Sequence, residues 1–127
     1  MARIAIVGAT GAVGTTMLDI LTERGHEPSE LRLMASSRSA GRVVPTKWGD
    51  VTIEDLATAD PAGIDIALFS AGGGRSKECG PSFASAGAVV VDNSSAFRMD
   101  ESVPLIVAQV NDHAVAAHNG IIANPNC

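Results

Sequence analysis

The sequence predicts an α/β fold with an open, mainly parallel β-sheet that carries helices on both faces, the doubly wound arrangement. Three observations support this prediction. A β-rich run at Arg3–Val7 is followed by glycine and then by helical spacing. The runs Ile64–Phe69 and Ala88–Asp92 are almost continuously apolar, as expected of strands covered on both faces. Strand and helix patterns also alternate along the chain, which is typical of parallel sheets.

The first predicted βαβ unit spans residues 3–35. Arg3–Val7 is its first strand. The segment Ala12–Arg24 then has apolar side chains at helical spacing, at Val13, Met17, Leu18 and Leu21. Turn-forming residues end this helix, and Leu31–Ala35 follows as the second strand.

The middle of the chain combines a polar stretch with a second helix. Val43–Val44 and Val51–Ile53 are predicted to form small edge strands, because glycine and proline interrupt the polar residues around them. We expect a helix over Arg75–Ala86. Pro81 lies inside it and lacks a backbone N–H, so the helix is expected to kink or restart there.

The last third of the chain predicts one more helix and one more strand. Asn111 or Asp112 is placed to cap a short helix that runs through Ala117. Gly120–Ala123 then forms a strand that leads into Asn124–Cys127.

Composition limits the classes of function. A chain of 127 residues with 46% apolar residues is the size of one globular domain. A net charge of -5 and 3% aromatic residues argue against a nucleic-acid partner. The first apolar run, Ile4–Val7, is too short for a signal peptide or a membrane span, so a soluble, cytoplasmic protein is expected. Cys79 and Cys127 lack the spacing of a disulfide framework or a zinc site, and no metal is expected.

A glycine pattern, Gly8-Ala-Thr-Gly-Ala-Val-Gly14, joins the first strand to the first helix. In that context glycines let backbone N–H groups approach a pyrophosphate at the positive end of the helix dipole. The sequence therefore predicts a Rossmann-like dinucleotide site. The alternative is an ordinary strand-to-helix turn that needs glycine only for its tight geometry. The candidate cofactor-binding residues in this loop are Gly8, Thr10, Gly11, Ala12, Val13 and Gly14.

The residues after the second strand indicate which dinucleotide binds. NAD-binding folds place an acidic residue there, about 20 residues past the glycines, to bind the ribose hydroxyls. Here the segment instead offers Ser36, Arg38 and Ser39. A guanidinium and hydroxyls suit a 2′-phosphate, so NADP is favoured over NAD. The alternative is that Arg38 is a solvated loop arginine.

A second loop of small residues follows the strand that ends at Phe69. Ser70, Ala71 and Gly72 are placed to lie against the cofactor at the same edge of the sheet. A merely permissive turn explains these residues equally well.

Five runs of the sequence together resemble a known family: Gly8–Gly14, Ala35–Gly41, Asp65–Gly72, Asp92–Arg98 and Gly120–Cys127. The family is that of the bacterial aspartate-semialdehyde dehydrogenases, and the resemblance spans the whole chain. It implies an NADPH-dependent enzyme that converts β-aspartyl phosphate reversibly to aspartate semialdehyde and phosphate, in lysine, threonine and methionine biosynthesis.

The same resemblance implies roles for individual residues. Cys127 matches the nucleophile, whose thiolate forms a thioester with the substrate. Arg98 matches a position that binds the phosphate of the substrate or product. Asn93 and Asn126 match polar positions near the cofactor and the thiol, although both also suit ordinary turns. Cys79 is expected to be a small buried hydrophobic residue.

The resemblance also implies a second domain downstream of Cys127, with the acid–base histidine and most of the homodimer or tetramer contacts. Residues 1–127 are then the NADP-binding domain of a longer dehydrogenase, and the isolated chain is expected to be inactive. His26, His113 and His118 lie in no matching catalytic motif.

Three other interpretations stay open. N-acetyl-γ-glutamyl-phosphate reductase uses comparable chemistry, but its cysteine motif usually differs from Asn-Pro-Asn-Cys127. Glyceraldehyde-3-phosphate dehydrogenase normally prefers NAD, which the segment around Arg38 argues against. The chain is alternatively a nucleotide-binding module without catalytic activity.

Overall fold

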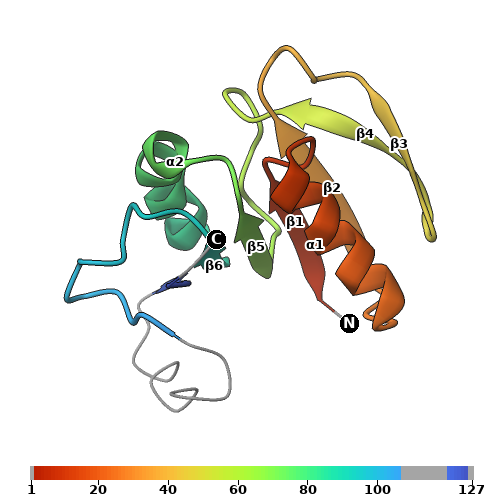
Figure 1. The fold of residues 1–127 in the computed structure, drawn as a ribbon. Helices are drawn as coiled ribbons and strands as arrows, with labels where there is room; N and C mark the ends of the chain where they lie inside the picture. The colour runs from red at the N-terminus through yellow and green to blue at the C-terminus, as the bar shows by residue number, and fades with distance from the viewer. Residues whose placement is uncertain (1, 107–119, 126–127) are drawn as a thin grey trace.

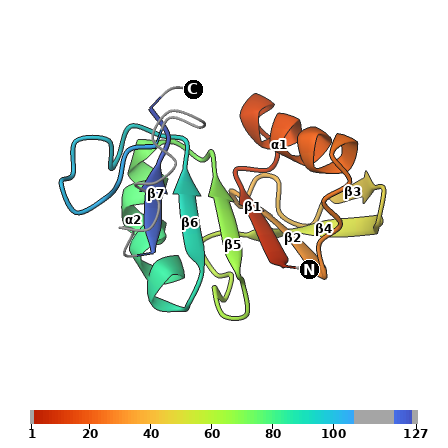
Figure 2. The same cartoon turned by 90° about the horizontal axis from the view of Figure 1, so that it is seen from below.

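The computed structural model describes residues 2–106 and 120–125. These residues contain seven strands in one sheet, in the order β3-β4-β2-β1-β5-β6-β7, and Figure 2 shows the strands in this order. The strands are β1 (Arg3–Val7), β2 (Glu30–Ala35), β3 (Val43–Thr46), β4 (Gly49–Asp55), β5 (Ile66–Phe69), β6 (Val89–Asp92) and β7 (Ile121–Ala123). Every neighbouring pair is parallel except the β3–β4 hairpin. The predicted open, mainly parallel sheet is confirmed.

Two helices cover opposite faces of this sheet. The helix α1 (Ala12–Glu23) lies beside β1 and β2, and α2 (Gly73–Ser85) lies beside β5 and β6 (Figure 1). Side chains alternate along β1, so Ile6 packs in the cluster under α1, whereas Ala5 and Val7 pack in the cluster under α2. Both faces of the sheet are therefore covered by a helix, as in the doubly wound arrangement.

The sheet has its topological switch point at β1. The chain runs from β1 through α1 to β2 on one side, and later returns to place β5 on the other side of β1. In open α/β sheets a crevice forms where the connections diverge, at the carboxyl ends of the strands. The loops after β1, β2, β5 and β6 therefore converge on one edge.

The helix α2 differs in one detail from the sequence prediction. It begins at Gly73 rather than at Arg75, and it continues through Pro81 without restarting. Pro81 and Lys77 are both exposed, so water can solvate the carbonyl that the missing proline N–H leaves free. Phe83 on the inner side of α2 packs edge-on against Phe69 of β5, which holds the helix on the sheet.

Two ion pairs join neighbouring strands at positions away from the glycine loop. The Arg3 guanidinium contacts the Asp65 carboxylate at 3.0 Å and joins the start of β1 to the residue before β5. Hydrogen bonding from Arg3 holds the pKa of Asp65 at about 2. Arg32 of β2 pairs with Glu54 of β4 at 2.7 Å.

The described residues include only part of the segment after β6 for which a helix and a strand are predicted. β7 confirms the strand expected at Gly120–Ala123, and Leu105 forms a parallel bridge with Ala123. The helix expected from Asn111 or Asp112 to Ala117 lies outside the described residues. Neither described helix is long and apolar enough to cross a membrane.

Candidate functional site

The glycine loop folds tightly over the end of β1. The backbone N–H groups of Gly8 and Ala9 both donate to the Met34 carbonyl of β2, at 2.8 and 3.1 Å. Gly8 has a φ of 89°, and a Cβ there would lie 2.8 Å from the backbone of Ser70. Only glycine meets both conditions, so Gly8 lets the loop after β5 approach the loop after β1.

Gly14 and Gly11 differ in what they do for this loop. A Cβ on Gly14 would lie 2.1 Å from the Gly8 carbonyl oxygen, so its absence lets α1 press directly against the loop. A Cβ on Gly11 would meet only that same carbonyl oxygen, at an ordinary 3.6 Å. The fold therefore requires Gly8 and Gly14, whereas the lack of a side chain at Gly11 leaves open space outside the loop.

Both helices begin at this edge with free N-terminal turns. Gly11 is the N-cap of α1 and Gly72 is the N-cap of α2. Within the described residues, neither helix has a side-chain cap or an acidic residue in its first turn. The dipole of α1 thus presents its positive end without a carboxylate to neutralise it, which favours a bound anion. At α2 the first backbone N–H groups are also uncapped, but the buried Asp92 carboxylate lies beside Ser76 of the first turn.

A hollow of about 200 Å³ lies between the glycine loop and the ends of β2 and β5, and we call it the Ser36 hollow. It is lined by Gly8, Thr10, Gly11, Ala35, Ser36, Leu56, Ser70, Ala71 and Arg75. Six of the predicted cofactor residues, Gly8, Thr10, Gly11, Ser36, Ser70 and Ala71, come together here.

A second hollow of about 270 Å³ lies on the other side of the glycine loop, and we call it the Asn93 hollow. It is lined by Val13, Ser70, Gly72, Gly73, Asn93, Ser94 and Ser95. The predicted residues Val13, Gly72 and Asn93 meet there, and Ser70 lines both hollows. A groove therefore follows the carboxyl ends of β2, β1, β5 and β6 in spatial order.

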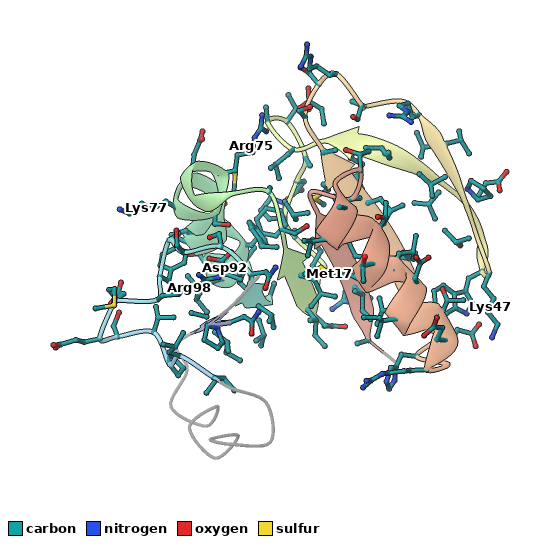
Figure 3. The ribbon with its side chains drawn as sticks, viewed as in Figure 1. Met17, Lys47, Arg75, Lys77, Asp92 and Arg98 are labelled. Carbon is teal, nitrogen blue, oxygen red and sulfur yellow. The ribbon has the colours of Figure 1, made fainter. Side chains whose placement is uncertain are left out.

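The groove continues over β7. A further hollow of about 220 Å³ is mostly apolar and shares Asn93 with the Asn93 hollow. Met17 of α1 forms one of its walls, and Ile122 and Asn124 form another (Figure 3 labels Met17). The groove therefore approaches the segment that leads to Cys127.

A buried carboxylate organises the loop after β6. Asp92 is fully buried and accepts hydrogen bonds from the Ser76 hydroxyl of α2 at 2.8 Å and from the Ser94 hydroxyl at 2.7 Å. The Ser94 backbone N–H donates to the same carboxylate at 3.1 Å. These bonds fix the loop that lines the Asn93 hollow to the helix beside it. Sequence reasoning did not assign Asp92 this role, although a lone acidic residue ending an apolar strand is a signal for it.

Arg98 and two asparagines connect the loops after β6 and β7. The Arg98 guanidinium donates from Nε to the Asn124 carbonyl at 2.7 Å and from Nη2 to the Asn93 carbonyl at 3.1 Å. The Asn124 side-chain amide donates to Asn93 Oδ1. Figure 3 labels Arg98 and Asp92. Arg98 thereby holds Asn124, directly after β7, beside Asn93.

Comparison with known proteins agrees with this geometry. The family model described as "Semialdehyde dehydrogenase, NAD binding domain" matches residues 3–118. The chain belongs to this family. The aspartate-semialdehyde dehydrogenase of Streptomyces akiyoshiensis is 59% identical over 126 residues, which cover 98% of this chain and 36% of that protein. The Bacillus subtilis enzyme is 50% identical over 125 residues, with the same coverage. The chain thus spans about a third of these relatives.

Solved structures show the same likeness. The Vibrio cholerae aspartate semialdehyde dehydrogenase II, complexed with ASA, superposes with a TM-score of 0.96 at 46% identity and covers 100% of this chain and 42% of that one. The Candida albicans enzyme with NADP superposes with a TM-score of 0.76 at 25% identity, over 98% of this chain and 42% of that one. The semialdehyde dehydrogenase domain thus has the fold of these enzymes.

Some of the predicted site residues lie outside the Ser36 and Asn93 hollows of this NAD-binding domain. Ala12 follows Gly11 at the start of α1, and Gly14 is buried under the loop. Ser39 lies beside the Ser36 hollow, with its hydroxyl 3.5 Å from that of Thr10. Arg38 is exposed on the same loop. Asn126 and Cys127 lie outside the described residues.

The described cysteine of the domain behaves as expected. Cys79 is half-buried and packs against the core cluster under α2. Burial raises the pKa of its thiol, and the neighbouring Glu78 charge adds to the effect. A protonated, packed thiol suits a structural role rather than a nucleophilic one. Among the described residues, no cluster of His, Cys, Asp and Glu is arranged to hold a metal ion.

A larger hollow lies at the opposite edge of the sheet. It measures about 590 Å³ and is bounded by the amino ends of β1 and β5 and by Gly25, His26 and Glu27 after α1. Because the strands are parallel, this hollow lies far from the glycine loop and from both helix N-termini. Ligands in such sheets bind at the carboxyl edge, where the smaller hollows lie.

Proposed function

We propose that residues 1–127 are the NADP-binding part of a longer aspartate-semialdehyde dehydrogenase. The observation that carries the proposal is the groove at the carboxyl edge, in which the glycine loop lies between the Ser36 and Asn93 hollows. The relatives that are 47–59% identical over nearly the whole chain support the same assignment. The chain spans only 36% of the first of them, which fits one domain of a longer enzyme.

The residues of the groove fit a dinucleotide. The glycine loop and the free N-terminal turn of α1 suit a pyrophosphate, because backbone N–H groups and the helix dipole meet its charge. The Ser36 hollow suits the adenosine half, and the Asn93 hollow suits the nicotinamide half, on the side that leads toward Cys127. A bound nicotinamide supplies hydride transfer.

We assign the preference for NADP to the segment after β2. Ser36, Arg38 and Ser39 offer hydroxyls and a guanidinium where NAD-binding folds carry an acidic residue. The Candida albicans relative, solved with NADP, supports this choice. Ser39 lies close enough to Thr10 for this segment to border the glycine loop.

The proposed substrate side centres on Cys127, Asn126 and Arg98. We assign Cys127 as the nucleophile: its thiolate attacks the β-carbonyl carbon of aspartyl phosphate, a thioester forms and inorganic phosphate leaves. We assign Asn126 as a residue that orients the substrate. Among the described residues, the Nη1 group of Arg98 makes no hydrogen bond, which leaves it available for a phosphate oxygen. The Vibrio cholerae relative, complexed with ASA, supports a small-molecule substrate of this kind.

The proposal is tested by titrating the purified 127-residue chain with NADP⁺ and NAD⁺ by calorimetry. We expect binding of both, with NADP⁺ tighter by about tenfold or more, since a 2′-phosphate adds charged hydrogen bonds. We expect no turnover with aspartate semialdehyde and phosphate, because we assign the acid–base group to a region downstream of Cys127. Absence of binding, or tighter binding of NAD⁺, would contradict the cofactor assignment. Measurable turnover would contradict the assignment of the acid–base group.

A further inference from the structure

Arg75 is a charged residue in a part of the site otherwise made of small and apolar groups. It lies in the first turn of α2, directly after Ser70-Ala-Gly-Gly-Gly74. Among the described residues that line the Ser36 hollow, Arg75 is the only one with a charged side chain. Figure 3 shows Arg75 at the end of α2, with Lys77 projecting from the other side of the helix.

We propose that Arg75 is a specificity-determining residue that binds the 2′-phosphate of NADP from the α2 side of the Ser36 hollow. This inference rests on the proposed cofactor function and goes beyond it, since the 2′-phosphate was assigned above to the segment around Arg38. Ser36 and Arg75 line the same hollow, whereas Arg38 does not line it.

The guanidinium of Arg75 is free to bind a ligand. Within the described part of the chain, it makes no hydrogen bond and no ion pair. All five of its N–H donors are therefore available, and two of them match two oxygens of a phosphate. No carboxylate among the described residues lines the hollow to compete for them.

The position of Arg75 favours the 2′-phosphate over the pyrophosphate. The pyrophosphate already has the glycine-loop amides and the first turn of α1. Ser36 directly follows β2, where folds of this class place the adenosine ribose hydroxyls. A long, flexible arginine that lines the hollow with Ser36 is suited to the phosphate on that ribose.

The test compares Arg75→Gln with the matched control Lys77→Gln. Both changes remove one positive charge from an exposed position on the same helix, but Lys77 does not line the hollow. Affinities for NADP⁺ and NAD⁺ are measured on the 127-residue chain, together with the fragments 2′,5′-ADP and 5′-AMP. Equal melting temperatures for both variants and the unsubstituted chain check that the fold is kept.

We expect Arg75→Gln to weaken NADP⁺ and 2′,5′-ADP by roughly tenfold to a hundredfold, the size expected for charged hydrogen bonds. NAD⁺ and 5′-AMP should change by less than about twofold, Lys77→Gln should leave all four affinities unchanged, and Arg75→Lys should recover part of the loss. Equal losses for NADP⁺ and NAD⁺ would overturn the inference in favour of a pyrophosphate or adenine contact. Unchanged NADP⁺ binding in Arg75→Gln would overturn it while leaving the proposed function intact. Failure of the unsubstituted chain to bind either dinucleotide would overturn both.

Discussion

At the scale of single residues, the three glycines of the loop have different reasons to be glycine. Gly14 lies directly against the Gly8 carbonyl, and Gly8 has a positive φ and lies against Ser70. Gly11 has neither constraint, since a Cβ would fit beside it. Two of the three glycines, Gly8 and Gly14, are therefore required by the fold. The third, Gly11, is not, and it leaves space beside the groove.

Replacing Gly14 and Gly11 by alanine separates these requirements. Gly14→Ala forces a Cβ into backbone, and we expect it to lower the free energy of unfolding by about 3 kcal/mol, the upper part of the range for overpacking. Gly11→Ala should lower that free energy by about 1 kcal/mol or less, because alanine is a poorer N-cap than glycine, and it should weaken NADP⁺ binding, because Gly11 lines the Ser36 hollow. Urea unfolding and calorimetric titration measure the two effects. Equal destabilisation by both changes would show that the loop is packed differently.

At the scale of elements, Asp92 fastens α2 to the end of β6. Its buried carboxylate joins Ser76 of the helix to Ser94 of the loop that lines the Asn93 hollow. The bonds reach sixteen residues along the chain to Ser76 and only two to Ser94. A local sequence pattern indicates the buried acid, but it does not reveal the distant partner Ser76 through which the groove keeps its shape.

Asp92→Ala tests this contact against a matched control. The substitution leaves the buried Ser76 hydroxyl without its acceptor, and we expect the free energy of unfolding to fall by about 3 kcal/mol. Asp100→Ala removes a comparable turn, in which Ser102 donates its backbone N–H and hydroxyl to an exposed carboxylate. It should cost about 0.5 kcal/mol or less. Chemical denaturation of both variants checks the contrast, and a loss of similar size at Asp100 would contradict the role of burial.

Most elements of the fold are predictable from local pattern. The apolar runs of β1, β2, β5 and β6 are nearly continuous, and helical spacing marks α1 within one residue of its observed end at Glu23. Val43–Val44 and Val51–Ile53 were predicted to be small edge strands. Both are longer than expected and pair as a hairpin, and only β3 lies at the edge, because β4 also pairs with β2. Continuity of α2 through Pro81 was not predictable, since solvent at that position decides whether the lost bond matters.

At the scale of the whole molecule, the site residues next to strand ends are predictable from the sequence. Those that only the tertiary fold brings to the site are not. Gly8, Ser36 and Ser70 are predictable because each directly follows a strand, and parallel strands bring such ends to one edge. Asn93 was assigned from the family resemblance, and it also directly follows a strand. Arg75 was missed because only the tertiary fold places the first turn of α2 across from Ser36. Arg98 was expected to bind phosphate, but its bonds to the Asn93 and Asn124 carbonyls depend on the pairing of β6 with β7.

The central claim is that a dinucleotide binds along the carboxyl edge of the sheet, and amide chemical-shift mapping tests it most directly. Two-dimensional ¹H–¹⁵N spectra of the 127-residue chain are recorded during titration with NADP⁺. We predict that the largest shifts cluster in residues 8–14, 36–39 and 70–75, around the Ser36 hollow and the two helix N-termini. Shifts centred instead on Gly25, His26 and Glu27, at the larger hollow on the opposite edge, would contradict this account.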